Sequence, residues 1–204
     1  MRLNLGCGSR VPHEWINVDY ALGARFMKIP YFRIINKKLK LFDLDWSEKI
    51  FLHDLTKKFP WTDNSIDVVY TSHTLEHFTK KDGRIFLIEC HRVLRKNGII
   101  RIVVPNLRSH MDDYMKGQIR ADEFVEKLGV LYKANNMLKK YLYPFFELST
   151  HKCMYDSPSL LEILKGIGFA ASNRAPFDSD ITDISRVELE GRTKNAVIVE
   201  GRKQ

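Results

Sequence analysis

Three histidines and a tyrosine are the residues in this chain best suited to proton transfer. His73 and His77 follow a predicted strand over 66–71, at the carboxyl end where a doubly wound sheet binds its ligand. His151 and Tyr155 belong to a segment that should return over that edge. Because an imidazole can remove a proton near neutral pH, His73 and His151 are our first catalytic candidates. For each histidine the alternative is a hydrogen-bonded packing residue.

The spacing of His73 and His77 also suits a metal site, because residues four apart share one face of a helix. The residues between them, Thr74, Leu75 and Glu76, do not follow the metalloprotease pattern, and the sequence shows no third ligand. We therefore predict no metal site.

A glycine turn near the start of the chain predicts a nucleotide site. After a short apolar strand over 3–5, Gly6 and Gly8 let the backbone approach a ligand closely, since no Cβ intervenes. Asp19 ends the next apolar run, where a carboxylate can accept hydrogen bonds from both hydroxyls of a ribose. Val11 replaces the third glycine of the dinucleotide pattern, which disfavours a nicotinamide or flavin. A tight turn without any ligand is the alternative.

Length and composition favour one domain over 1–204. The chain has 204 residues, of which 44% are hydrophobic, enough for one well-buried core and few for two. The net charge of +8 is spread over scattered basic pairs, which favours a solvated basic surface over a nucleic-acid or membrane partner.

The expected location is the cytoplasm. The first strand begins almost at Met1, which leaves no room for a signal peptide, and no apolar run reaches the length of a membrane span. Cys7, Cys90 and Cys153 are odd in number and lack paired spacing, which argues against disulfides and a zinc cluster.

Further short apolar runs predict a parallel sheet covered on both faces. The later strands are expected at 50–53, 66–71, 99–104, 169–175 and 196–199, the last two as a hairpin pair. Helices are expected at 82–94 and after Asp156-Ser157-Pro158, where proline takes the first helical position.

Two segments are not needed for that sheet. Residues 21–49 are basic and aromatic, which suits a lid, a peripheral membrane contact or an irregular cap on the sheet edge. Residues 107–150 have helical periodicity. We expect both to border the acceptor pocket, with the aromatic run 141–146 beside His151 and Tyr155.

An ordered set of motifs gives the chain its family resemblance. They are Gly6-Cys7-Gly8, Asp19, Asp54-Leu55, Phe59-Pro60-x-x-Asp63-Asn64-Ser65-x-Asp67, Leu75-Glu76-His77, Glu89-x-x-Arg92-Val93-Leu94-x-x-x-Gly98 and Pro105-Asn106. The set resembles the class I S-adenosylmethionine-dependent methyltransferases. The tail, with His151-Lys152-x-Met154-Tyr155, Ser159-Leu160 and Gly168-Phe169, resembles small bacterial members often associated with surface-glycan biosynthesis.

The resemblance implies an α/β, Rossmann-like, doubly wound seven-stranded sheet, mostly parallel with its last strand antiparallel and a helical insertion after strand 5. It implies S-adenosylmethionine as cofactor and in-line methyl transfer to a small-molecule or glycan acceptor. The residues expected to bind the cofactor are Asn4, Gly6, Cys7, Gly8, Asp19, Tyr20, His53, Asp54, Leu55, Ser72 and His73.

The chain departs from the family at Asn4, where an acid is usual, and in having two glycines in the turn. The short interval from Gly8 to Asp19 predicts a first helix of only one or two turns. The alternatives to a small-molecule enzyme are a non-catalytic S-adenosylmethionine-binding regulator, an interaction module and an RNA methyltransferase. The sequence predicts no oligomeric state.

Overall fold

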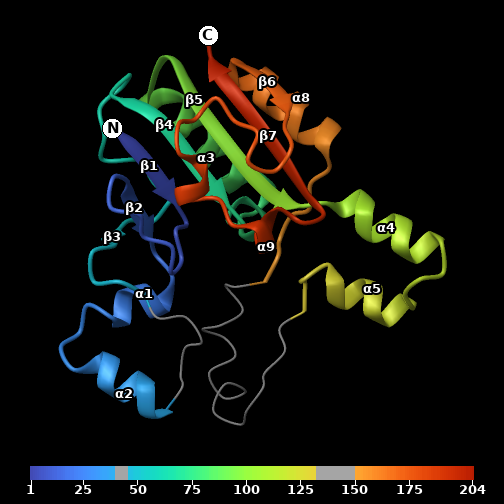
Figure 1. The fold of residues 1–204 in the computed structure, drawn as a ribbon, viewed down its shortest axis with the longest axis horizontal. Helices are drawn as coiled ribbons and strands as arrows, with labels where there is room; N and C mark the ends of the chain where they lie inside the picture. The colour runs from blue at the N-terminus through green and yellow to red at the C-terminus, as the bar shows by residue number, and fades with distance from the viewer. Residues whose placement is uncertain (40–45, 132–149) are drawn as a thin grey trace.

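The computed structural model describes residues 1–39, 46–131 and 150–204, which form a seven-stranded sheet with helices around it (Figure 1). The strands are β1 (Arg2–Leu5), β2 (Ile16–Asp19), β3 (Phe51–Leu52), β4 (Ile66–Ser72), β5 (Leu94–Pro105), β6 (Phe169–Asn173) and β7 (Ala196–Lys203). The helices are α1 (Leu22–Phe26), α2 (Phe32–Leu39), η1 (Leu75–His77), α3 (Lys80–Val93), α4 (Leu107–Met115), α5 (Ala121–Lys127), α8 (Ser157–Ile167), η3 (Ile184–Arg186) and α9 (Glu190–Thr193).

The strand order is β3-β2-β1-β4-β5-β7-β6. The strands from β3 to β5 pair in parallel, whereas β7 is antiparallel to both β5 and β6. This topology confirms the predicted Rossmann-like sheet with an antiparallel last strand. The chain order reverses between β1 and β4, and it is at such a switch point that open α/β sheets bind ligands.

Helices α3 and α8 cover one face of the sheet. Their apolar side chains pack with Leu3, Val69 and Ile100 from three neighbouring strands. Helix α8 begins at the predicted Asp156 cap, with Pro158 at its second position instead of its first. The Asp156 carboxylate accepts the backbone N–H of Ser159, and the helix ends before Gly168, which has φ of 113°.

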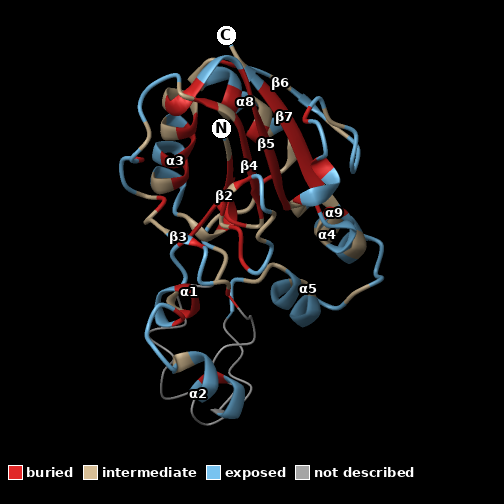
Figure 2. Ribbon diagram, turned by 60° about the vertical axis from the view of Figure 1, so that its left-hand side comes forward, coloured by how far each residue is buried: buried red, intermediate tan, exposed pale blue. Residues whose placement is uncertain are grey.

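The opposite face is covered by the excursion between β6 and β7 instead of long helices. Ile181, Ile184 and Val187 from this excursion pack against Tyr70 and Val103 of the sheet. Both faces are therefore buried, as Figure 2 shows by the red strands. The predicted coverage is confirmed, although the connection is far longer than a hairpin.

A buried arginine holds this excursion in place. Arg101 in β5 has no exposed surface, and its guanidinium pairs with Glu188 at 2.7 Å and with Glu200 of β7 at 3.2 Å. It also donates to the carbonyls of Asp178 and Ala175. The two carboxylates are themselves almost fully buried, so Glu188 depends on Arg101 for charge compensation, whereas Glu200 also has Arg174 Nη2 at 3.7 Å.

One predicted helix is absent from the described structure. The connection from Gly8 to β2 contains turns only, so the expected one or two helical turns were wrong. The amide of Asn4 donates to the Arg10 carbonyl and to Asn17 Oδ1, each at 2.9 Å. The amide of Asn17 in turn donates to the carbonyl of Pro12 at 3.0 Å. These buried hydrogen bonds satisfy backbone carbonyls of the connection in the absence of helical hydrogen bonds.

The strand boundaries also differ from expectation. The third strand is shorter than predicted and β6 ends at Asn173, while β5 begins five residues early at Leu94. That early start comes from a separate pairing of Leu94 with Ile66, next to an irregularity in the β4–β5 ladder.

The two predicted insertions leave the sheet at the carboxyl ends of the parallel strands (Figure 1). Helix α1 packs beside the glycine turn, where Ala24 and Met27 contact Cys7 and Trp46 in a small core. Helices α4 and α5 have no buried residues (Figure 2). The aromatic run 141–146 lies outside the described residues. No helix in the described ranges is long and apolar enough to cross a bilayer.

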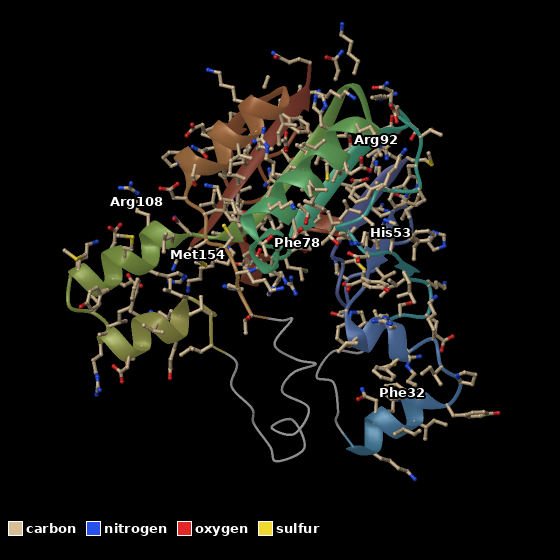
Figure 3. The ribbon with its side chains drawn as sticks, turned by 180° about the vertical axis from the view of Figure 1, so that it is seen from behind. Phe32, His53, Phe78, Arg92, Arg108 and Met154 are labelled. Atoms are coloured by element: carbon tan, nitrogen blue, oxygen red, sulfur yellow. The ribbon has the colours of Figure 1, made fainter. Side chains whose placement is uncertain are left out.

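Part of the motif set has a structural role. Arg92, at the end of α3 (Figure 3), bonds Glu89 at 2.7 Å and Asp63 at 2.6 Å and donates to the Phe59 carbonyl. Glu89 also accepts the backbone N–H of Phe59 at 2.7 Å. These residues tie the turn before β4 to α3, so their spacing reflects folding rather than ligand binding.

Replacing Arg101 with methionine should lower the free energy of unfolding by about 3–5 kcal/mol, because Glu188 stays buried without its cation and Glu200 keeps only the more distant Arg174. Chemical denaturation would measure this. The matched control is Arg95→Met, which removes an exposed ion pair with Asp67 and should cost less than about 1 kcal/mol. Equal losses in the two variants would contradict a stabilising role for the buried pair.

Candidate functional site

The glycine turn after β1 has the geometry of a close-approach site. Gly6 and Gly8 have φ of +69° and +54°, in the left-handed region that favours glycine. A Cβ on Gly6 would lie 2.0 Å from Thr74 Oγ1, so this glycine makes room for the turn after β4. Among the described residues, a Cβ on Gly8 would have only Arg192 Nη2 within 4 Å, at 3.9 Å, so there is room beside this glycine although the residue itself is buried.

The N–H groups of this turn are already used within the protein. Gly6 and Cys7 donate to the carbonyl of Val18, and Gly8 donates to Asp19 Oδ2 at 2.8 Å. Asp19 also accepts the N–H of Ala21 at Oδ1. Each carboxylate oxygen accepts one bond here and can accept more. A ligand over the turn would therefore meet the glycine Cα surface and the carboxylate.

Cys7 and Asn4, both expected to bind the cofactor, are mainly structural. The side chain of Cys7 packs against α1, and burial raises the pKa of its thiol far above its usual range. Both amide hydrogens of Asn4 are donated within the protein, which leaves its Oδ1 for a ligand.

The end of β3 presents a second carboxylate near the first. His53 follows β3 (Figure 3), and its backbone N–H donates to the Asp19 carbonyl at 3.3 Å. Its buried Nε2 has no partner among the described residues. Asp54 Oδ1 accepts both bonds from Thr56, which leaves Oδ2 available. Burial alone would raise the pKa of Asp54, but these bonds outweigh it and lower the pKa.

The two remaining residues near this edge differ in exposure. Leu55, expected at the cofactor, packs in the main core, so only its backbone could reach a ligand. Tyr20 is exposed and its ring lies under the Arg25 guanidinium at 4.9 Å.

Arg192 of α9 closes the other side of the turn, and sequence reasoning missed it. Its Nη1 donates to the Ser72 carbonyl at 3.3 Å, and its carbonyl contacts His73 Nε2 at 2.9 Å. A cation thus lies between Gly8 and the end of β4. No motif indicated this residue, because it comes from the irregular segment before β7.

The turn after β4 buries a carboxylate that the sequence analysis had not selected. Glu76 in η1 has no exposed surface, and neither of its oxygens has a well-formed hydrogen bond in the described part of the chain. The nearest basic atom is His73 Nδ1, 3.3 Å from Oε1. Burial lowers the pKa of His73, but Glu76 and the Arg192 carbonyl outweigh it, so the net shift is upward.

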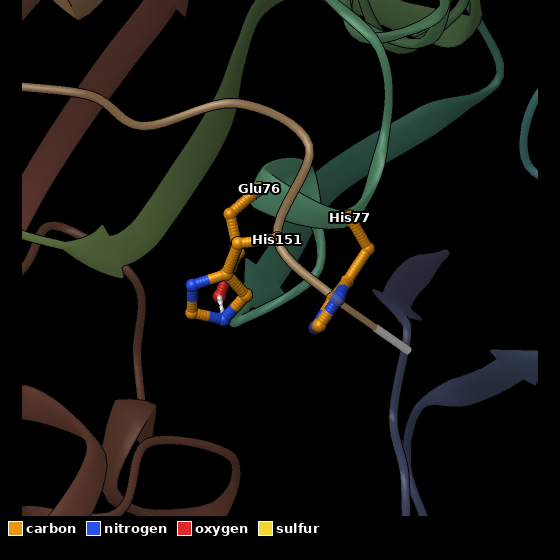
Figure 4. Close-up of side chains that lie close together, drawn as sticks. All are labelled: Glu76, His77 and His151. Atoms are coloured by element: carbon orange, nitrogen blue, oxygen red, sulfur yellow. Dashed lines mark ion pairs between the residues drawn. The ribbon is translucent and has the colours of Figure 1, made fainter. Parts of the chain in front are cut away.

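Two further histidines meet at this carboxylate (Figure 4). His151 Nε2 lies 4.0 Å from Glu76 Oε1, and the rings of His77 and His151 have centroids 5.1 Å apart. Burial lowers the pKa of His77, although Glu76 opposes the shift. Helix η1 is a single 3₁₀ turn and His73 precedes it with φ of +51°, so the predicted helical face shared by His73 and His77 was wrong.

The position of His151 depends on the end of α5. Its Nδ1 contacts the Leu128 carbonyl at 2.7 Å, and its backbone N–H donates to the Gly129 carbonyl. A Cβ on Gly129 would lie 2.6 Å from His151 Nδ1. The described part of the 107–150 insertion therefore borders the cluster. Tyr155, by contrast, lies in the main core, and burial raises the pKa of its hydroxyl, so it is a poor candidate base.

Comparison with known proteins gives one family match. A family model described as a methyltransferase domain matches residues 3–102, just under half of the chain. This match supports a class I S-adenosylmethionine-dependent methyltransferase. This methyltransferase is therefore an enzyme, and its cofactor is S-adenosylmethionine. No curated protein matches the methyltransferase in sequence.

Three solved structures share the fold of this methyltransferase at low identity. The Bacillus subtilis YcgJ protein is 13% identical over 100% of this chain and 91% of its own, with a TM-score of 0.52. A SAM-dependent methyltransferase from Archaeoglobus fulgidus is 17% identical over 99% of this chain and 85% of its own, with a TM-score of 0.50. Burkholderia thailandensis 1,6-didemethyltoxoflavin-N1-methyltransferase is 14% identical over 100% of this chain and 70% of its own, with a TM-score of 0.51. That structure holds S-adenosylhomocysteine.

The residues after β1, β2 and β3 fit a nucleoside cofactor. There is room beside Gly8, one carboxylate ends β2 and a second follows β3 at Asp54, and the buried Nε2 of His53 lacks a partner in the described structure. Hydroxyl and amino groups of a nucleoside can supply hydrogen bonds to such acceptors.

Gly129→Ala should displace His151, and Gly117→Ala is its matched control. Both glycines have φ of +67°, so alanine costs each about 1–2 kcal/mol of backbone strain, but no atom of the described residues lies within 4 Å of a Cβ on Gly117. We expect a larger loss of stability in Gly129→Ala, with shifted His151 imidazole resonances in ¹H–¹⁵N NMR spectra only in that variant. Identical His151 resonances in both variants would contradict this contact.

Proposed function

We propose that this enzyme methylates a polar atom of a small-molecule or glycan acceptor bound beside the Glu76, His77 and His151 cluster. The observation that carries the proposal is that these polar groups converge next to the glycine turn, through Thr74, which contacts Gly6. Partly buried, converging polar groups suit a compact acceptor, whereas a duplex nucleic acid needs an open basic groove.

His151 is the better of the two proposed bases. Both ring nitrogens of His73 are engaged, by Glu76 and by the Arg192 carbonyl. His151 uses Nδ1 at the Leu128 carbonyl, which leaves Nε2 able to accept a proton. S-adenosylmethionine supplies a sulfonium-activated methyl group. The acceptor's lone pair forms the new bond to that methyl as the carbon–sulfur bond breaks, and the acceptor's proton passes to His151 or to solvent.

The proposed cofactor contacts place the ribose at Asp19 and the adenine at Asp54. Asp19→Ala should weaken S-adenosylmethionine binding by about 1.5–3 kcal/mol, because the ribose hydroxyls lose a charged acceptor. Asp19→Asn keeps the shape and one acceptor oxygen, but it loses the charge together with the bond from Gly8 or from Ala21. Asp54→Ala should matter less. Calorimetry measures all three, and unchanged affinity in Asp19→Ala would place the ribose elsewhere.

The same calorimetry should show no binding of NAD, because Val11 replaces the third glycine of the dinucleotide turn. Tight NAD binding without any response to S-adenosylmethionine or S-adenosylhomocysteine would overturn the placement.

His151→Ala should lower turnover while cofactor affinity stays nearly unchanged, because the residue lies on the acceptor side of the turn. The acceptor is found by screening nucleotide sugars, oligosaccharides, small metabolites and RNA for formation of S-adenosylhomocysteine. Exposed His13 provides the control substitution His13→Ala, which should leave turnover as in the parent. Loss of cofactor binding in His151→Ala would contradict this division of roles, and methylation of RNA alone would contradict the acceptor class.

A further inference from the structure

The cluster at the end of β4 has a ligand set that the methyl transfer described above does not use. Each of Glu76, His77 and His151 offers one ligand atom, and these atoms all lie within 4.8 Å of one another (Figure 4). They come from two distant segments, joined where Lys152 and Cys153 donate to the Glu76 carbonyl. The prediction of no metal rested on the lack of a third ligand beside His73 and His77. The fold brings two further possible ligands, Glu76 and His151, beside His77.

The outer contacts of both imidazoles prepare them as ligands. His77 Nδ1 contacts the Thr150 carbonyl at 3.3 Å and His151 Nδ1 contacts the Leu128 carbonyl at 2.7 Å. A carbonyl only accepts, so each Nδ1 carries the hydrogen and each Nε2 keeps a lone pair. Metal-binding histidines usually have this arrangement, in which a backbone carbonyl fixes the tautomer and ring orientation.

The Glu76 carboxylate is the second, independent observation. It is fully buried, and its two oxygens accept no well-formed hydrogen bond within the described ranges. An unpaired buried carboxylate is costly, so buried charges are paired or coordinate metals.

We propose that Glu76, His77 and His151 bind one divalent first-row transition-metal ion. Two imidazoles and one carboxylate with open positions are the ligand set of catalytic zinc and non-haem iron sites, whereas Mg²⁺ and Ca²⁺ prefer oxygen ligands. Ligand atoms around a tetrahedral ion lie about 3.4 Å apart, given bonds of about 2.1 Å. The present separations are at most 4.8 Å, and side-chain rotation of the two partly exposed histidines can bring the ligand atoms closer.

The role of the ion at the acceptor rests on the proposed function. An oxygen-bearing acceptor, such as a sugar hydroxyl, would take an open position on the ion, which holds the oxygen and lowers its pKa. With Nε2 of His151 on the ion, the hydroxyl proton leaves to solvent instead of to His151.

Cobalt(II) titration of the tag-free, EDTA-treated full chain tests the ion site without any acceptor. We expect one equivalent to bind with visible d–d absorption, zinc(II) to displace it, and magnesium(II) to leave it unchanged. Glu76→Gln, His77→Ala and His151→Ala should each weaken cobalt binding by more than about tenfold. His13→Ala removes an exposed histidine and should bind as the parent does.

Cofactor calorimetry on the same variants separates the two proposals. Where Glu76→Gln fails to fold, His77→Ala and His151→Ala decide, because both rings are partly exposed. Absence of one-equivalent cobalt binding by the parent, or its persistence in both histidine variants, would overturn the ion site even if S-adenosylmethionine still binds. Cobalt binding with full methyl transfer after chelation would support the site and overturn only its role at the acceptor.

Discussion

A carboxylate without exposed surface needs a nearby cation or a full set of hydrogen bonds, and the arrangement around Glu76 follows from that need. Basic side chains approach it from the turn after β4 and from the start of the tail at His151. The backbone of Glu76 also holds the tail, because its carbonyl accepts two N–H groups there. One residue thus fixes both the charge balance of the site and the path of the chain over the sheet edge.

The glycine turn at Gly6 and Gly8 and the cluster around Glu76 are joined by contacts of two side chains. Thr74 fills the space that a Cβ on Gly6 would need, so the turn after β4 sits directly against the glycine turn. Arg192 reaches both from the far side, through Gly8 and Ser72. Groups that align an acceptor with a methyl must be held within a fraction of an ångström, and such direct contacts between turns supply that rigidity.

The sequence predicted what depends on local pattern. Alternating and continuous apolar runs located the strands, the Asp156 cap located α8, and ordered motifs identified the family. It could not predict features that arise between distant segments. Arg101 interrupts an apolar run, and its burial is explained only by the ion pairs with Glu188 and Glu200, which come from distant segments. Glu76 was quoted within a motif, but its burial beside His151, 75 positions later, is a product of the fold.

The short connection between Gly8 and β2 explains a second departure from the family pattern. Without a crossover helix, the connection needs other partners for its carbonyls, and Asn4 and Asn17 supply them from two neighbouring strands. An aspartate at position 4 could accept hydrogen bonds but could not donate one to the Arg10 carbonyl. Asn4 is therefore better explained as the residue that this connection requires than as the loss of a cofactor contact, and its remaining oxygen can still accept a bond from a ligand amine.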